Sequence, residues 1–357
     1  MWPSCWESLA WMFRKDILAK LVLSLLIGAL FAWLVARGGV PLVPTAESFA
    51  HIHWWAVPLY VFTLGVSHWF RATRWRFLLN PVIPLPTAEV VRVSWVGFLA
   101  IFALPLRVGE IVRPALLKLR HGVSLSTGLG TVAVERVIDG LVTSLAVVWA
   151  VFFLPHQTSS ERLVQSLPYY AYLTLFVFVG AFLFLGLFLY QREFASTFLR
   201  RSVGLISPKG GEYLSVKLDS LANGLQSLAR PTLLVPFMIE TSIYWGLNAF
   251  GMWLLARGCG LPIHLGHAVG LMGILAIGVL LPAGPGLFGN FQLAVSIGLK
   301  LYLAGHWVVD EGAVYIFLLY TIQAVFVAIT GLVPLYFMKV RLRDVLSPSQ
   351  VPPAPGP

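Results

Sequence analysis

The sequence predicts an all-α polytopic integral membrane protein, with about six full transmembrane helices and two broken or re-entrant helical hairpins. Hydrophobic residues make up 58% of the 357 and charged residues only 11%, whereas soluble domains are about 45–50% apolar and about 25% charged. The mean hydropathy is +0.82. No segment alternates polar and apolar residues long enough for a membrane barrel, so the spans are predicted to be helices. Six segments have the roughly 20 apolar residues that a spanning helix needs: 17–36, 54–79, 124–154, 169–190, 231–256 and 312–338.

The first of these segments has the layout of either a signal peptide or an uncleaved span. Arg14, Lys15 and Lys20 precede the apolar run 21–36. The run ends Leu-Val-Ala-Arg, which is a poor small-x-small cleavage site. We therefore interpret it as an uncleaved first transmembrane helix.

Two further apolar regions are interrupted near their middle. In residues 88–120, an apolar stretch ends at Pro105 and a charged segment follows, too short and too charged to cross lipid easily. In residues 265–304, a Pro-Gly-rich turn at 282–286 separates two apolar arms that could just span. Both regions are interpreted as re-entrant hairpins. The predicted tip residues are Pro105, Gly109, Pro282, Pro285, Gly286, Gly289 and Asn290.

The basic residues predict the orientation of the spans. If each full span changes sides and each hairpin returns, most of the 25 Lys and Arg residues lie on the side of the N-terminus. This asymmetry obeys the positive-inside rule and places both termini in the cytoplasm of a cell (inner) membrane. The order span, hairpin, span occurs at 54–154 and again, with opposite entry, at 231–338. Opposed units with broken helices are typical of secondary transporters, so we expect an inverted-topology repeat.

The whole of residues 1–346 is expected to form one transmembrane domain. Its longest polar stretch, 191–230, is predicted to be cytoplasmic. Within it, leucines recur at alternating spacings of four and three residues, which predicts an amphipathic helix that either caps the bundle or senses lipid. The Pro-rich tail 347–357 is expected to be disordered.

Charged side chains cluster in the first hairpin and the third span. The spacing of Arg107, Glu110 and Arg113 places them on one helix face, and Glu135 and Asp139 share another. Arginines bind phosphate through two parallel hydrogen bonds, so the cluster predicts a polar cavity for a charged headgroup. The alternative is a salt-bridge network that pins the hairpin to the third span. The candidate substrate-binding residues are Arg107, Glu110, Arg113, Glu135, Arg136, Asp139 and Glu240.

Glu240 stands alone in the fifth predicted span, with Tyr244 and Asn248 following on the same helix face. We expect it to pair with Arg136 or with an arginine of the first hairpin, to carry protons, or to be solvated at the end of the span. Nothing in its neighbourhood decides among these roles.

A basic and aromatic cluster closes the second predicted span. It contains Arg71, Arg74 and Trp75, and we expect these side chains to anchor the protein at the headgroup interface. The nearby His68 has no companions at metal-ligand spacing and is also expected at the interface, as are His51 and His53.

The sequence indicates no cofactor, no metal ligand set and no catalytic residue. Cys5 and Cys259 are the only cysteines and form no metal motif. No nucleotide-binding motif is present, which argues against an ATP-driven pump. The net charge is +10, and the basic residues flank apolar segments. This distribution fits binding to anionic lipid headgroups better than binding to nucleic acid.

Several of these motifs together resemble the lysylphosphatidylglycerol synthase transmembrane, or flippase-like, family. They are Arg71-x-x-Arg74-Trp75, Asn80, residues 105–110 (Pro-Leu-Arg-Val-Gly-Glu), Arg113, residues 135–139 (Glu-Arg-Val-Ile-Asp) and Pro282-x-x-Pro285-Gly286-x-x-Gly289. The resemblance covers roughly residues 15–340. It implies a lipid flippase or scramblase, with membrane lipids as partners that are anionic, aminoacylated or linked to polyprenyl phosphate. No aminoacyltransferase domain follows the last span, so lysyl transfer is not expected.

Two other functions stay open at this point. An integral membrane transferase would use Glu110, Glu135 or Asp139 as a general base on a lipid-linked substrate. A non-catalytic subunit would instead present lipid to a separate glycosyltransferase or synthase.

Overall fold

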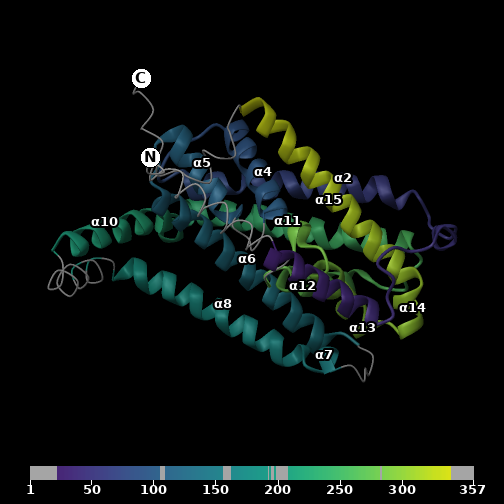
Figure 1. Cartoon of the computed structure of the whole chain (residues 1–357). Helices are drawn as coiled ribbons and strands as arrows, with labels where there is room; N and C mark the ends of the chain where they lie inside the picture. Colours follow the sequence, from purple (N-terminus) through teal and green to yellow (C-terminus); the bar gives the residue numbers. More distant parts are fainter. Residues whose placement is uncertain are drawn as a thin grey trace, which may run out of the picture.

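The computed structural model describes residues 22–104, 109–155, 162–191, 193, 197, 208–281 and 284–338. Every regular element in these ranges is a helix, which confirms the all-α class (Figure 1). The longer helices are an N-terminal helix (Val22–Arg37), α2 (Ala56–Thr73), α4 (Thr87–Ala103), α5 (Val112–His121), α6 (Leu125–Phe153), α8 (Leu167–Tyr190), α10 (Pro208–Leu225), α11 (Pro231–Gly258), α12 (Leu265–Gly278), α13 (Asn290–Tyr302) and α15 (Glu311–Met338). The short elements are η1 (Ala46–Phe49), α3 (Trp75–Leu79), α7 (Arg162–Gln165), η3 (Gln226–Ala229), η4 (Pro285–Leu287) and α14 (Gly305–Val309).

A helix lies in each of the six segments predicted to span. Within the described ranges, three helical stretches are long and apolar enough to cross a membrane: Leu125–Phe153, Leu167–Tyr190 and Gly305–Met338. The total of six full spans stays a prediction.

Helix α8 is the most apolar and the most exposed of these three helical stretches. Of its 24 residues only Leu167 and Ala171 are buried, while large side chains such as Phe176 and Phe184 are exposed. It lies alongside α6 at the edge of the bundle (Figure 1). A helix this apolar and this exposed fits direct contact with lipid.

The first predicted hairpin forms from α4 and α5, which run antiparallel. A Cβ on Gly97 would lie 2.1 Å from Cγ of Arg113, and one on Gly109 would lie 2.1 Å from the backbone of Ala100. Both glycines are therefore required for the arms to approach this closely. With 10 residues, α5 is about 15 Å long, half the roughly 30 Å hydrocarbon core. The tip, including Pro105 and Arg107, lies outside the described residues.

The second hairpin forms from α12 and α13, of 14 and 13 residues. Each is about 20 Å long, so these arms are also short for a full crossing. Gly286 and Gly289 have φ angles of 74° and 89°, a conformation that glycine adopts readily. The Asn290 amide donates to the Gly278 carbonyl at 3.3 Å and so ties the tip to α12. Pro282 lies outside the described residues.

The two span, hairpin, span units pack in corresponding ways. Helices α2 and α11, the first of each unit, lie antiparallel, with Gly258 against Ala56 and Gly251 against Thr63. The last helix of each unit packs on the first hairpin arm of the other, α15 on α4 and α6 on α12. The second tip also contacts α15, because the Tyr320 hydroxyl donates to the Gly286 carbonyl at 3.0 Å.

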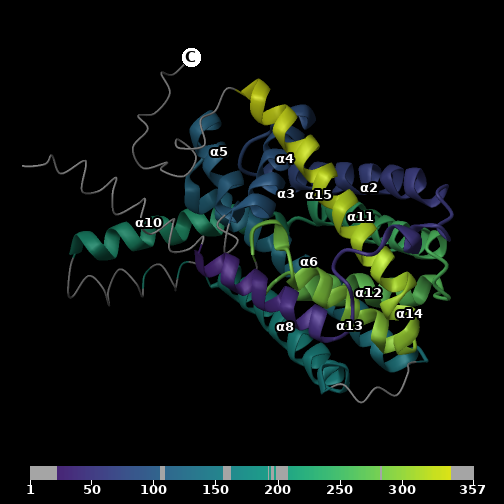
Figure 2. The same ribbon diagram turned by 45° about the vertical axis from the view of Figure 1, so that its right-hand side comes forward.

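The N-terminal helix covers the second hairpin tip. A Cβ on Gly28 would lie 3.1 Å from Cα of Gly284, and one on Gly289 would lie 2.4 Å from the Gly28 carbonyl oxygen. Figure 2 shows this helix, in purple, in front of the bundle beside α13. The contact between backbones holds the broken tip in place.

The predicted amphipathic helix is α10, and it packs on the bundle. Gly224 lies against Gly130 and the Thr127 carbonyl of α6, and Leu225 is fully buried. The helix therefore packs over one end of α6, as expected if it caps the bundle. The side chain of Leu214 lies outside the described residues.

Candidate functional site

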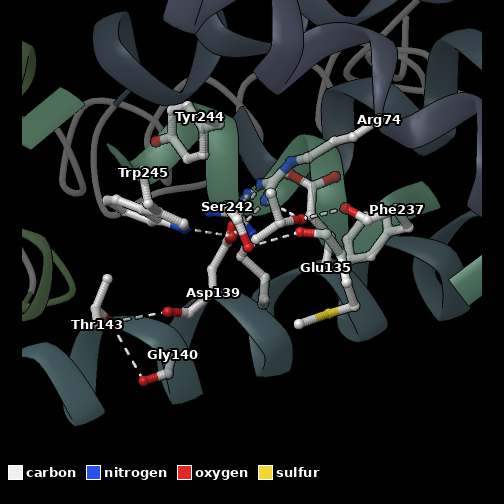
Figure 3. Close-up of polar contacts among 12 residues, drawn as sticks. Arg74, Glu135, Asp139, Gly140, Thr143, Phe237, Ser242, Tyr244 and Trp245 are labelled. Carbon is white, nitrogen blue, oxygen red and sulfur yellow. Dashed lines mark hydrogen bonds and ion pairs between the residues drawn. The ribbon is translucent and has the colours of Figure 1, made fainter. Parts of the chain in front are cut away.

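The centre of the bundle holds a buried ion network around Arg74 (Figure 3). The two terminal nitrogens of the Arg74 guanidinium donate to the two carboxylate oxygens of Asp139, at 2.6 and 2.7 Å, and so form a bidentate pair. The same guanidinium donates to Glu135 at 3.2 Å and to the Thr241 hydroxyl at 3.1 Å. Arg74 and Glu135 have no exposed side-chain surface.

Two more arginines complete the network. Arg113 of α5 donates to the second Glu135 oxygen at 2.9 Å. Arg136 contacts both Glu135 and Asp139. Three arginines thus surround two carboxylates, and all four Glu135 and Asp139 oxygens have an arginine within ion-pair distance.

Aromatic rings fill the space around these guanidinium groups. Arg74 lies 4.9 Å from the Tyr244 ring centroid, and Arg113 lies 4.7 Å from that of Trp75. Such cation–π contacts are stronger away from water. Burying a charge costs desolvation free energy, which ion pairs and hydrogen bonds offset only when their geometry is good. The cation–π contacts help to offset the remainder.

A cavity of about 180 Å³ opens directly beside the network. Its charged lining residues are Arg71, Arg136 and Asp139. Its remaining wall is mostly apolar and comes from both units and from α8. This wall includes Leu64, Ile101, Phe178, Met272, Leu275, Leu280, Leu287, Phe291 and Val327. The lining is therefore amphipathic, because charged groups and hydrocarbon side chains face the same space.

Arg71 differs from the arginines of the network. Among the described residues no carboxylate lies within ion-pair distance of it, and its buried Nε has no hydrogen-bond partner. The guanidinium lies instead 4.1 Å from the ring centroid of Phe98 and 5.8 Å from that of Tyr244. A cation held by two rings at the wall of a cavity can accept an anion without first breaking an ion pair.

The structure brings together four of the predicted substrate-binding residues: Arg113, Glu135, Arg136 and Asp139. Glu110 lies in the turn before α5, close enough to act electrostatically on Arg136, and Arg107 lies outside the described residues. The prediction that Glu240 pairs with Arg136 or an arginine of the first hairpin is wrong for the described residues. Its carboxylate accepts from Arg76 at 2.8 Å and from the Thr73 hydroxyl at 2.6 Å, because α11 runs antiparallel to α2.

The predicted interfacial cluster is also corrected. Arg74 and Trp75 have no exposed surface, and the Trp75 indole donates to Thr131 at 3.1 Å. His68 is buried as well, with its ring near those of Trp95, Phe98 and Phe326. These side chains face the bundle because α4, α6, α11 and α15 surround the end of α2.

Sequence reasoning missed several residues that line the cavity. Gln323, Phe178 and Trp245 are among them, and the Trp245 indole donates to Asp139 at 3.0 Å. A lone glutamine in the apolar helix α15 was a signal that could have been used, because amides are costly in hydrocarbon. Phe178 gave no such signal, since phenylalanine is common throughout α8.

No three His, Cys, Asp or Glu side chains come close enough to hold a metal ion anywhere in the described ranges. The model of one known family, the lysylphosphatidylglycerol synthase TM region, matches residues 18–341. No curated protein and no solved structure shows a match. With nearly the whole chain matched and an all-helical bundle in the structure, the chain belongs to the family of the lysylphosphatidylglycerol synthase transmembrane region.

Proposed function

We propose that this protein is a lipid flippase or scramblase, which holds a phosphate-bearing headgroup beside the charged residues of the cavity. One observation carries the proposal: Arg71 faces an amphipathic cavity with no carboxylate partner among the described residues. A lipid headgroup has the complementary form, a phosphate attached to hydrocarbon. Arginine binds phosphate strongly through charge-assisted hydrogen bonds.

The ion network supports a positioning role beside this site. Glu135 and Asp139 are engaged by arginines on both oxygens, which leaves them poorly suited to act as a general base. They hold Arg136 at the cavity wall and tie Arg74, α5 and α6 together. This favours a binding and translocating protein over a transferase.

The packing of the two units supports alternating access. We infer that they form an inverted-topology repeat, in which α2 pairs with α11 and each closing helix packs on the other unit's hairpin. Both hairpins contribute to the cavity near their tips, since Ile101 and Leu287 line it. Broken helices at a central site are the arrangement in which opposed repeats rock against each other in transporters. Both termini are proposed to be cytoplasmic.

Translocation of fluorescent phospholipid in proteoliposomes tests this function. The protein should accelerate the exchange of labelled lipid between leaflets over protein-free vesicles. Arg71→Gln removes a charge-assisted hydrogen bond to phosphate, worth about 1.5–3 kcal/mol, so the rate at subsaturating lipid should fall about 10- to 100-fold.

Arg257→Gln is the matched control. Arg257 is exposed in the last turn of α11 and does not line the cavity, so its loss should leave the rate unchanged. If lipid moves no faster with the protein than without it, for every phospholipid and polyprenyl phosphate tried, the proposed function is wrong.

A further inference from the structure

The charged side chains that line the cavity differ in whether they are already held by an oppositely charged partner. Among the residues that the structure describes, three charged side chains line it: Arg71, Arg136 and Asp139. Oδ1 of Asp139 accepts from Arg74 at 2.6 Å and from the Trp245 indole at 3.0 Å. Oδ2 accepts from Arg74 at 2.7 Å and lies 3.3 Å from Arg136.

A cationic amine would therefore find no available carboxylate among the described residues that line the cavity. The carboxylate is already occupied, and displacing Arg74 would leave a fully buried guanidinium without its bidentate partner, a strongly destabilising change. An ammonium group would also lie beside Arg71 and Arg136 and be repelled by both. An anion meets the opposite situation, since the guanidinium of Arg71 is available.

The uncharged polar groups of the cavity suit hydroxyl groups. Asn248 lines it, and no hydrogen bond of its amide is found among the described residues. Gln323 uses its amide nitrogen to donate to Tyr60 at 2.8 Å, which leaves its carbonyl oxygen as an acceptor. An amide offers both donor and acceptor, as a headgroup hydroxyl requires.

From this arrangement we propose that the cavity selects an anionic phosphate lipid whose headgroup carries hydroxyls and no amine, such as phosphatidylglycerol, and rejects its aminoacylated form. This inference rests on the proposed function, because it names the substrate of the same cavity. Discrimination follows from repulsion by two arginines, with no free carboxylate among the described lining residues, as much as from attraction. We expect the Kd for phosphatidylglycerol to be lower than that for lysylphosphatidylglycerol by about tenfold or more.

Binding is best compared in nanodiscs that contain equal amounts of phosphatidylglycerol, phosphatidylethanolamine and lysylphosphatidylglycerol. Native mass spectrometry of the released protein then gives the occupancy of each lipid. The wild-type protein should retain phosphatidylglycerol. Asn248→Asp places an available carboxylate in the cavity and should shift the ratio toward the two amine-bearing lipids by about tenfold.

Asn223→Asp is the matched control for this variant. Asn223 is exposed on α10 and lies away from the cavity, so it should leave the ratio as in the wild type. Retention of lysylphosphatidylglycerol as well as or better than phosphatidylglycerol by the wild-type protein would overturn the inference on its own, without affecting translocation. An unchanged ratio in Asn248→Asp would also overturn it.

A soluble phosphate is the other source of the same chemistry. Glycerol 3-phosphate added at the concentration of the lipid should fail to displace the retained phosphatidylglycerol, because it cannot occupy the apolar wall. Displacement at equal concentration would assign the site to a soluble anion, and both the inference and the proposed function would fall.

Discussion

Neutralising Glu135 should destabilise the bundle more than neutralising Glu240, a buried carboxylate that is held by an arginine outside the network. In Glu135→Gln, Arg74 and Arg113 each lose a charged partner while their side chains stay at most 1% exposed. Removing one partner of a buried ion pair costs about 3–5 kcal/mol, because an uncompensated charge remains. The substitution keeps the side-chain size, so this loss is electrostatic and not a packing defect.

Glu240→Gln is the comparison that gives this prediction its meaning. Glu240 also accepts two hydrogen bonds, but its partner Arg76 is 39% exposed and can turn to solvent. Its loss should cost only about 1–2 kcal/mol. Unfolding of the detergent-solubilised protein by sodium dodecyl sulfate, followed by tryptophan fluorescence, measures both changes in the free energy of unfolding. If Glu135→Gln is no more destabilising than Glu240→Gln, the network does not act as a buried and mutually compensated unit.

Further predictions concern glycines at close contacts. Gly97→Ala places a Cβ 2.1 Å from Cγ of Arg113 and should lower the free energy of unfolding by about 1–3 kcal/mol through overpacking, measured by the same unfolding assay. Gly140→Ala places a Cβ 2.1 Å from the Phe178 ring; it should displace that ring at the cavity wall and lower retention of phosphatidylglycerol in nanodiscs. Gly180→Ala has no neighbour within 4 Å and should be neutral or slightly stabilising in both assays. Equal effects at all three positions would contradict the packing described.

The polar cluster of the third span and first hairpin was largely predictable from local spacing. Glu135 and Asp139 are one helical turn apart, and Arg113 is too costly in lipid to lie there without a partner. Helical periodicity therefore placed Glu135 and Asp139 on one helix face, and ion pairing with the first hairpin was one of the two interpretations that remained. The structure adds which arginine holds which oxygen, which spacing alone cannot determine.

The role of Arg74 could not be predicted in the same way. A basic and aromatic cluster at the end of an apolar segment has the composition of an interfacial anchor. Whether that end lies at the interface or inside the bundle depends on how far α4, α6 and α11 extend around it, which is a property of long-range packing. Arg74, Trp75 and His68 were misplaced for this common reason.

Glycine has a similar ambiguity in a membrane sequence. Gly97, Gly140 and Gly224 are each next to a side chain or backbone of another helix, whereas Gly180 and Gly186 have open space around them. All five occur in helices with no distinguishing local pattern. Only the packed structure shows which of them permit a close contact.

Photo-crosslinking at Phe178 most directly tests the central claim that a lipid headgroup binds beside Arg71. A benzoylphenylalanine at Phe178 lines the cavity, and one at Phe184, whose side chain is 65% exposed on the same helix, serves as the lipid-facing control. With phosphate-labelled lipids, both positions should be labelled in the wild-type background. If the headgroup binds beside Arg71, Arg71→Gln should strongly reduce labelling at Phe178 and leave labelling at Phe184 unchanged. Labelling at Phe178 that is insensitive to Arg71→Gln would contradict the claim.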